Sequence, residues 1–194
     1  MKAFFHPSQD QHLPKTYFTR GQMRQPQEIP DRTAQMLEGL KAMGIPVLQP
    51  ADQGAGAISK VHDLGYLRFL ESAHRRWSKM EDWGDEVISN IFVRSPNALK
   101  GILAEAARYQ ADGSCPIGAN TWDAAYWSAQ TALGAADALV AGERHAWRSS
   151  RSGSTTLCRQ GAATSSNARV RSGLHATPRT SSQAAQISTQ TSAP

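Results

Sequence analysis

Cysteines and long hydrophobic runs are scarce in this sequence. Its 194 residues include only two cysteines, Cys115 and Cys158, too few for the disulfide framework of a small secreted protein and in keeping with a reducing compartment. No segment approaches the roughly 18 consecutive apolar residues of a membrane-spanning helix. The N-terminal segment turns polar after five residues, too early for a signal peptide. We therefore expect a cytoplasmic protein with no membrane partner.

Short motifs that reveal many enzymes are also missing. There is no Gly-rich phosphate loop, no G-x-S-x-G elbow and no C-x-x-C pair. The histidines stand at positions 6, 12, 62, 74, 145 and 175, and none has another metal-ligating residue at a spacing typical of a metal site. We interpret His6 and His12 as satisfied loop histidines rather than metal ligands, and His62-Asp63 as the start of a helix. Cys115 has no basic neighbour in sequence that would activate it, which favours a structural thiol.

Acidic residues are absent from the last quarter of the chain. Residues 147–194 contain six of the 21 basic residues, all Arg, and none of the 16 acidic residues. Residues 1–146 therefore hold 15 basic and 16 acidic residues, so the net charge of +5 belongs to the C-terminal segment. The nearly neutral region 1–146 gives no reason to expect nucleic acid or a membrane as a partner.

The N-terminal residues predict a strand, a long loop and a helix. An apolar segment over 2–5 predicts a short strand that ends before Pro7, and the polar residues 8–30 predict a long loop. A helix follows from Pro30, with Asp31 as its N-cap and Gly44 as its stop. Its expected apolar stripe is Met36, Leu37, Leu40 and Met43.

The next segments extend this pattern to a parallel α/β arrangement. Residues 45–50 predict a second strand, and residues 57–77 are helical in periodicity. Strand, helix and strand in this order are typical of a parallel sheet. Residues 81–90 predict a turn and a short extended piece, and residues 95–118 predict a weak helical stretch and a loop.

The longest predicted helix covers residues 121–141. Thr121 is the expected N-cap, Asp123 lies in the first turn, where an acid is favoured, and Gly142 ends the helix. Its alanines indicate close packing against a sheet. The expected buried face is Trp122, Ala125, Ala129, Leu133, Ala136 and Val140. Few strands are predicted by residue 146, so we expect an incomplete α/β domain over 1–146.

Several stretches in order resemble the bacterial acetylpolyamine amidohydrolases, within the histone deacetylase superfamily. "FHPSQDQHLP" and "EIPDR" resemble the first loop and helix start of that family. "ISKVHDLGYLRFLESA" is similar to its I-x-x-V-H-D-x-x-Y-L-x-F-L-x-x-A segment. "SCPIGANTWDAAYWSAQTALGAADALVAG" is similar to the loop and long helix before the active-site strand. The resemblance covers about three quarters of the chain, over residues 1–146.

The resemblance implies an arginase/deacetylase-like three-layer fold, of which this chain has the N-terminal portion. It also implies hydrolysis of N-acetylated polyamines or acetyl-lysine-like amides by a zinc ion held by two aspartates and a histidine. In that chemistry zinc polarises the carbonyl and activates water, a histidine pair handles protons, and a tyrosine assists. Members of the family are often homodimers.

The family's R-P-P-G-H-H-A, G-G-x-C-Y and D-x-D-x-H motifs are absent from residues 1–194. We therefore expect no bound zinc, no catalytic residues and no activity from this chain.

Only peripheral residues carry over by resemblance. Arg32 matches an arginine that lines the inner channel of deacetylases, although a helix-start salt bridge explains it equally well. Ser114 replaces the aspartate with which histone-type enzymes grip a peptide backbone, which suits a small amine. Asp112 is either a rim acid that attracts a polyamine cation or a solvated loop acid.

Residues 147–194 form a Ser/Thr/Arg/Ala-rich segment that we expect to be disordered. A slip of the reading frame explains it: at a one-base offset, Thr155-Thr156-Leu157 can encode His-His-Ala, and 161–165 can conceal Gly-Cys-Tyr-Leu. The alternative is a genuine basic tail, which would make the chain a non-catalytic interaction protein that binds an acidic partner or RNA. Six dispersed arginines, with no aromatic residue after Trp147, are a weak platform for RNA.

Overall fold

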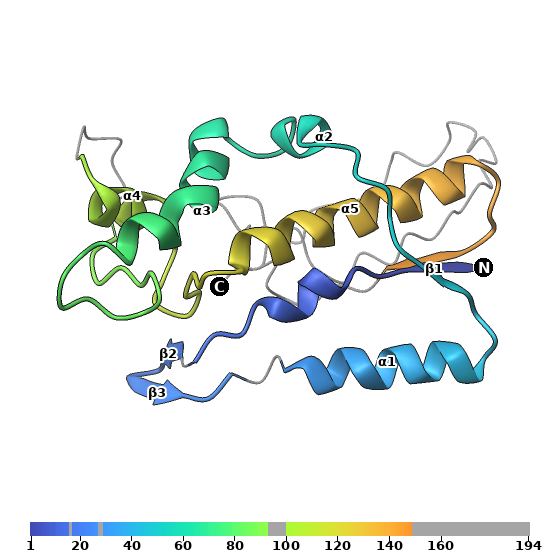
Figure 1. Cartoon of the computed structure of the whole chain (residues 1–194), viewed down its shortest axis with the longest axis horizontal. Coiled ribbons are helices and arrows are strands. Elements are labelled where there is room, and N and C mark those ends of the chain that lie inside the picture. Colours follow the sequence, from blue (N-terminus) through green and yellow to red (C-terminus); the bar gives the residue numbers. More distant parts are fainter. Residues whose placement is uncertain (16, 27–28, 93–99, 149–194) are drawn as a thin grey trace, which may run out of the picture.

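A three-stranded parallel sheet lies between helices in the computed structural model, which describes residues 1–15, 17–26, 29–92 and 100–148. The strands are β1 (Lys2–Phe4), β4 (Val47–Leu48) and β5 (Ala146–Arg148). Figure 1 shows helix α5 (Thr121–Val140) on one side of β1 and helix α1 (Pro30–Ala42) on the other. The predicted α/β class with a parallel sheet is confirmed.

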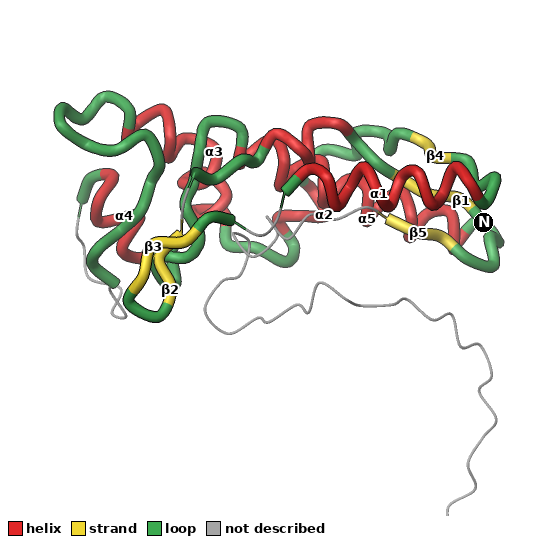
Figure 2. Tube along the Cα trace, turned by 90° about the horizontal axis from the view of Figure 1, so that it is seen from below, coloured by secondary structure: helices red, strands yellow, loops and turns green. Residues whose placement is uncertain are grey.

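Strand β1 lies at the centre of this sheet, in the order β4-β1-β5 (Figure 2). Ala3 is opposite Val47 on one side and Trp147 on the other, and both pairings are parallel. Phe4, Ala135 and Ala138 form the buried core between the sheet and α5. A Cβ at Gly134 would lie 3.2 Å from the Phe4 ring and 3.4 Å from Pro50. The small residues of α5 therefore let the helix approach the strand closely, as the alanines predicted.

A larger core joins three further helices to the N-terminal half of α5. These helices are α2 (Gly56–Ser59), α3 (Leu64–Trp77) and α4 (Ile102–Tyr109). Its buried residues are Ile58, Tyr66, Leu67, Phe69, Leu70, Ala73, Trp77, Val87, Ile102, Ala106, Ile117 and Ala125. The side chain of Asp63 caps α3 by accepting a hydrogen bond from Tyr66 N at 3.1 Å. The interpretation of His62-Asp63 as a helix start is confirmed.

The predicted long loop over 8–30 is wrong in part, because it contains secondary structure. Pro7–Gln11 form a 3-10 helix, η1, which packs against α5. Strands β2 (Tyr17–Thr19) and β3 (Gln22–Arg24) form an antiparallel hairpin. Its two-residue turn places Arg20 at φ 50° and Gly21 at φ 76°. Positive φ at both turn residues suits the right-handed twist of a tight hairpin.

Both predicted N-caps are also wrong. Ile29 precedes α1 and caps it without a side-chain bond, so Asp31 lies in the first turn. Asn120 occupies the N-cap position of α5, likewise without a side-chain bond. Thr121 is the first helical residue, and its Oγ1 accepts a hydrogen bond from Gly118 N at 2.8 Å.

The expected buried faces of the two helices need correction too. The buried residues of α5 are Thr121, Ala124, Ala125, Ser128, Gln130, Thr131, Ala135 and Ala138. Of the predicted face, Ala125 is therefore buried as expected, and Trp122, Ala129 and Leu133 are half-buried. Ala136 is exposed and Val140 is 89% exposed. In α1, Leu40 and Thr33 are buried, but Met43 follows the helix and is exposed. The apolar pattern misplaced the α5 face in part because that face also buries polar side chains.

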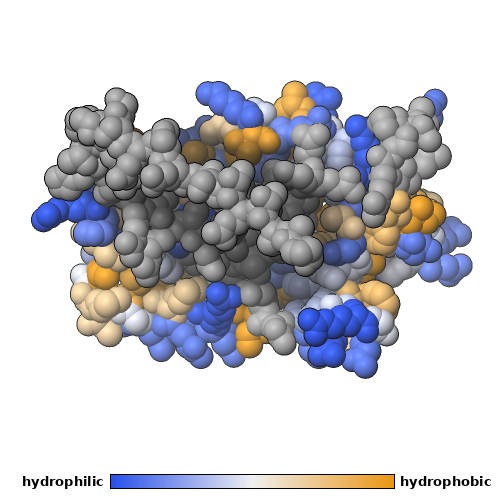
Figure 3. All heavy atoms as spheres, turned by 180° about the vertical axis from the view of Figure 1, so that it is seen from behind, coloured by the Kyte–Doolittle hydropathy of each residue, from blue (hydrophilic) through white to orange (hydrophobic). Residues whose placement is uncertain are grey.

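Strand β5 carries the described fold two residues past the predicted boundary at residue 146, to Arg148. The proposed frame-slip sites at 155–157 and 161–165, like Cys158, lie outside the described residues. No helix in the described part of the chain has the length and apolar character needed to cross a membrane. On the face opposite that of Figure 1, hydrophobic side chains form patches separated by hydrophilic ones (Figure 3).

Candidate functional site

The loop between α4 and α5 brings two of the three predicted site residues together. Asp112 Oδ1 accepts a hydrogen bond from Ser114 N at 2.7 Å, which makes a local turn. Ser114 Oγ donates to the Phe18 carbonyl at 2.7 Å, and Phe18 N donates to the Gly113 carbonyl at 3.3 Å. The loop and the β2–β3 hairpin are therefore joined by hydrogen bonds in both directions. Asp112 is exposed and Ser114 is half-buried.

The third predicted residue, Arg32, lies on a different element. It is exposed in the first turn of α1, where its backbone N–H donates to Ile29 O at 3.3 Å. The structure therefore does not gather Arg32, Asp112 and Ser114 on one loop. Their roles at a substrate remain predictions.

A short β-bridge holds the far end of this loop. Val87 N donates to Ile117 O at 2.9 Å, and Ile117 N donates to Val87 O at 3.1 Å. Both side chains are buried in the larger core. The loop is thus fixed to the core at Ile117 and to the hairpin at Gly113 and Ser114.

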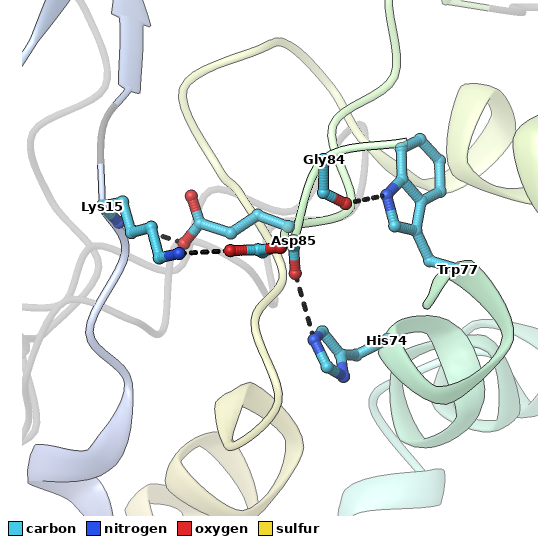
Figure 4. A network of polar contacts seen from close by, with 6 residues as sticks. Lys15, His74, Trp77, Gly84 and Asp85 are labelled. Carbon is cyan, nitrogen blue, oxygen red and sulfur yellow. Dashed lines mark hydrogen bonds and ion pairs between the residues drawn. The ribbon is translucent and has the colours of Figure 1, made fainter. Parts of the chain in front are cut away.

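A polar network ties the N-terminal segment to the residues before this bridge (Figure 4). Lys15 Nζ forms an ion pair with Asp85, and Lys15 N donates to Glu86 Oε1 at 3.0 Å. The hydrogen bond with Asp85 raises the pKa of Lys15 and lowers the pKa of Asp85. Burial raises the pKa of Glu86. Because the Lys15–Asp85 pair is exposed, it orients the segment more than it stabilises the fold.

His74 and Trp77 on α3 complete this network. His74 Nε2 donates to the Asp85 carbonyl at 3.0 Å, and Trp77 Nε1 donates to the Gly84 carbonyl at 2.8 Å. The segment 84–86 is consequently held from both sides. Sequence reasoning missed the Lys15 contacts because Lys15 and its partners are 70 and 71 residues apart in the chain.

The two N-terminal histidines have structural contacts, as predicted. The His6 ring stacks on Trp127 with centroids 3.7 Å apart, and its Nδ1 accepts a hydrogen bond from Ser8 N. His12 Nδ1 lies 2.8 Å from Thr121 Oγ1. Burial lowers the pKa of His6. Both rings thereby fix the N-terminal segment to α5.

The described residues do not fit the zinc site that the resemblance implies. Across residues 1–148, apart from the undescribed positions, no three His, Cys, Asp or Glu side chains lie close enough together to hold a metal ion. The donor set for zinc needs three such ligands or more.

Comparison with known proteins identifies what this fold is similar to. The chain is 61% identical over 140 residues to an acetylpolyamine amidohydrolase of Burkholderia pseudomallei. This part of the chain is homologous to the acetylpolyamine amidohydrolases. The acetylpolyamine amidohydrolase of Mycoplana ramosa is 32% identical over 150 residues, and acetylpolyamine amidohydrolase 1 of Pseudomonas aeruginosa is 33% identical over 144. No family model matches the chain.

A crystal structure of an acetylpolyamine aminohydrolase from Burkholderia pseudomallei has the same fold in its matching part. The TM-score is 0.72 at 59% identity, over 74% of this chain and 42% of that one. The match to the Burkholderia sequence covers 72% of this chain and 41% of the relative. The chain thus spans less than half the length of the acetylpolyamine amidohydrolases it matches, which is consistent with a match to their N-terminal part alone.

Proposed function

We propose that this chain carries the N-terminal framework and part of the substrate rim of a zinc-dependent acetylpolyamine deacetylase, and that the 194-residue polypeptide does not itself catalyse deacetylation. The assignment to the N-terminal framework rests on the 61% identity to an acetylpolyamine amidohydrolase. At that identity the fold and the local loop structures of homologues are shared, and the solved relative supports this with its TM-score of 0.72.

The proposed substrate is a small acetylated amine with a positive charge away from the acetyl group. Asp112 is exposed on the loop that Ser114 and Phe18 hold in place, so its carboxylate is available to a cation. A serine at position 114 has no charge with which to grip a peptide backbone. A flexible polyamine cation needs an acid at long range rather than a backbone clamp.

The proposed lack of activity rests on the residues that the chain contains. No His-His pair and no D-x-D-x-H segment occurs in the sequence, and these are the groups that the resemblance assigns to proton transfer and to zinc. We attribute the difference to a one-base change of reading frame after residue 146. Reading the DNA over codons 140–170 tests this: a single-base shift restores the His-His-Ala and Gly-Cys-Tyr segments, and failure to restore them contradicts the frame slip.

A deacetylation assay tests the function. The purified 194-residue chain is incubated with an acetylated polyamine and added zinc, and the Burkholderia pseudomallei relative serves as the active control. We expect release of acetate by the control and none above the blank by this chain. Release of acetate that a chelator abolishes and zinc restores would contradict the proposal.

A further inference from the structure

Gln110 is a buried polar side chain that binds three separate backbone groups. It follows α4 directly and is 5% exposed. Its Oε1 accepts a hydrogen bond from Ser89 N at 2.8 Å. Its Nε2 donates to Val87 O at 2.8 Å and to Cys115 O at 3.1 Å. Both amide hydrogens are therefore used, and the oxygen has a partner as well.

These bonds join the two segments that the Val87–Ile117 bridge also joins. The bridge supplies one pair of backbone hydrogen bonds between residues 87 and 117. The Gln110 amide adds three more, on Val87, Ser89 and Cys115. A side-chain amide has the same donor and acceptor groups as a peptide unit. The Gln110 amide therefore binds the backbone as a neighbouring strand would. It reinforces the Val87–Ile117 bridge, which is too short to be stable alone.

We infer that Gln110 is the positioning residue of the loop 111–117, which holds Asp112 and Ser114 in place relative to the core. The inference rests on the proposed function in so far as that loop is part of the substrate rim. Gln110 acts through the loop backbone.

The Val87–Ile117 bridge holds the C-terminal end of the loop, and two further contacts lie between Gln110 and that bridge. The Asp112–Ser114 bond lies within the loop. The bonds to Phe18 connect the loop to the β2–β3 hairpin, in which Phe18 and its cross-strand neighbour Met23 are both exposed. A solvated two-stranded hairpin is marginally stable on its own. The hairpin therefore adds little rigidity to the loop, and Gln110 joins the loop to the core at Cys115, two residues before the bridge.

Gln130 offers a matched control because it makes the same kind of contact elsewhere. It is fully buried in α5, accepts a hydrogen bond from Gln53 N and donates to Gly54 O, both at 3.0 Å. Through these bonds it holds the loop after β4 rather than the loop 111–117. Loss of either amide removes hydrogen bonds to backbone groups; those of Gln110 to Val87 and Ser89 are buried, and those of Gln130 to Gln53 and Gly54 are partly buried.

The test measures how fast the Cys115 thiol reacts with a disulfide reagent, in full-length protein with Cys158→Ser. We expect Gln110→Leu to raise this rate by about tenfold or more, since opening of the loop no longer breaks the buried hydrogen bonds. Gln130→Leu should leave the rate within about twofold of the parent. Equal rates in Gln110→Leu and the parent, or an equal rise in Gln130→Leu, would overturn the inference.

A second variant covers the case in which Gln110→Leu does not fold. An ionised Gln110→Glu side chain accepts from Ser89 N but faces the Val87 and Cys115 carbonyls without a hydrogen to donate, whereas the protonated acid donates one bond. The ratio of its Cys115 reaction rate to that of the parent should fall as the pH is lowered from 8 to 5. A ratio that does not change with pH contradicts the inference. No substrate is used, so the proposed function can fail without affecting this result.

Discussion

The two hydrophobic cores of this molecule differ greatly in size. The core around α3 and α4 buries twelve residues, among them Tyr66, Phe69 and Trp77. Among the described residues, the core between the sheet and α5 buries three: Phe4, Ala135 and Ala138. Helix α5 contributes to both, with Ala125 in the first and its C-terminal half in the second (Figure 1).

The sheet also has little cover at one edge. Val47 and Leu48 in β4 are 39% and 41% exposed. A parallel sheet in an α/β protein is normally buried on both faces, with strands that are nearly all apolar. In the described residues the helical core is thus large and well buried, whereas the sheet has a small core and an exposed edge strand. We therefore expect the helical core to provide most of the stability of the fold.

The largest expected effect comes from truncating one aromatic residue in each core. Phe69→Ala removes a ring that is 1% exposed and should lower the free energy of unfolding by about 3–5 kcal/mol. Phe4→Ala should cost less than about 3 kcal/mol, because the ring shares its small core with two alanines rather than with larger side chains. Urea unfolding followed by circular dichroism measures both. An equal or larger loss for Phe4→Ala would show that the sheet core is the main source of stability.

Acid should weaken the fold in two separate pH ranges. Burial lowers the pKa of His6 and of His62 from 6.5, so the folded state favours their neutral forms. Their contribution to the free energy of unfolding is fully present above pH 6.5 and is lost as the pH falls through their folded-state pKa values. Hydrogen bonds lower the pKa of Asp52, Asp85 and Glu105, so their contribution is lost only further down, below about pH 4.

Substituting each histidine in turn shows how much the sheet and the helical core each contribute to this pH response. His6→Gln and His62→Gln should each flatten the fall in stability that begins below pH 6.5, measured as the urea midpoint from pH 7.5 to 5. His6 reports on the end of β1, and His62 on the start of α3. A pH dependence unchanged in both variants would assign the loss to other groups.

The smallest expected effect belongs to the ion pair between α3 and α4. Arg76 and Glu105 are joined by two hydrogen bonds, of 2.6 and 2.7 Å, and about a third of each side chain is exposed. Such a pair contributes about 0.5–1 kcal/mol and weakens in salt. A double-mutant cycle with Arg76→Gln and Glu105→Gln measures it. A coupling energy that does not decrease in 1 M salt would contradict an electrostatic origin.

Much of this fold could be predicted from the sequence, where apolar periodicity and local signals agree. Strand β1, strand β4, the Asp63 cap and the helix stop at Gly142 all follow such signals. The hairpin was missed because its turn is Arg20-Gly21 rather than the usual Asn-Gly. Tyr17, Phe18 and Thr19, all good strand formers, are the signal that could have located it.

The parts that sequence could not supply depend on specific long-range hydrogen bonds. The buried face of α5 includes Gln130 and Thr131, which an apolar stripe does not include. Gln130 is buried because it binds the backbone of residues 53 and 54. In the same way, nothing local in sequence pairs Gln110 with Ser89, or Ser114 with Phe18. Asp112 and Ser114 are predicted as rim residues by resemblance, whereas the contacts of Gln110 are seen in the structure alone.

Native-state hydrogen exchange tests the contrast between the two halves most directly. The exchange of individual amides is followed at low concentrations of denaturant, where local and global opening can be separated. We expect the buried amides of α3 and α4 to exchange only through global unfolding, and those of β1 and the C-terminal half of α5 through an opening of lower free energy. Equal protection of β1 and α3, with the same dependence on denaturant, would contradict a less stable sheet.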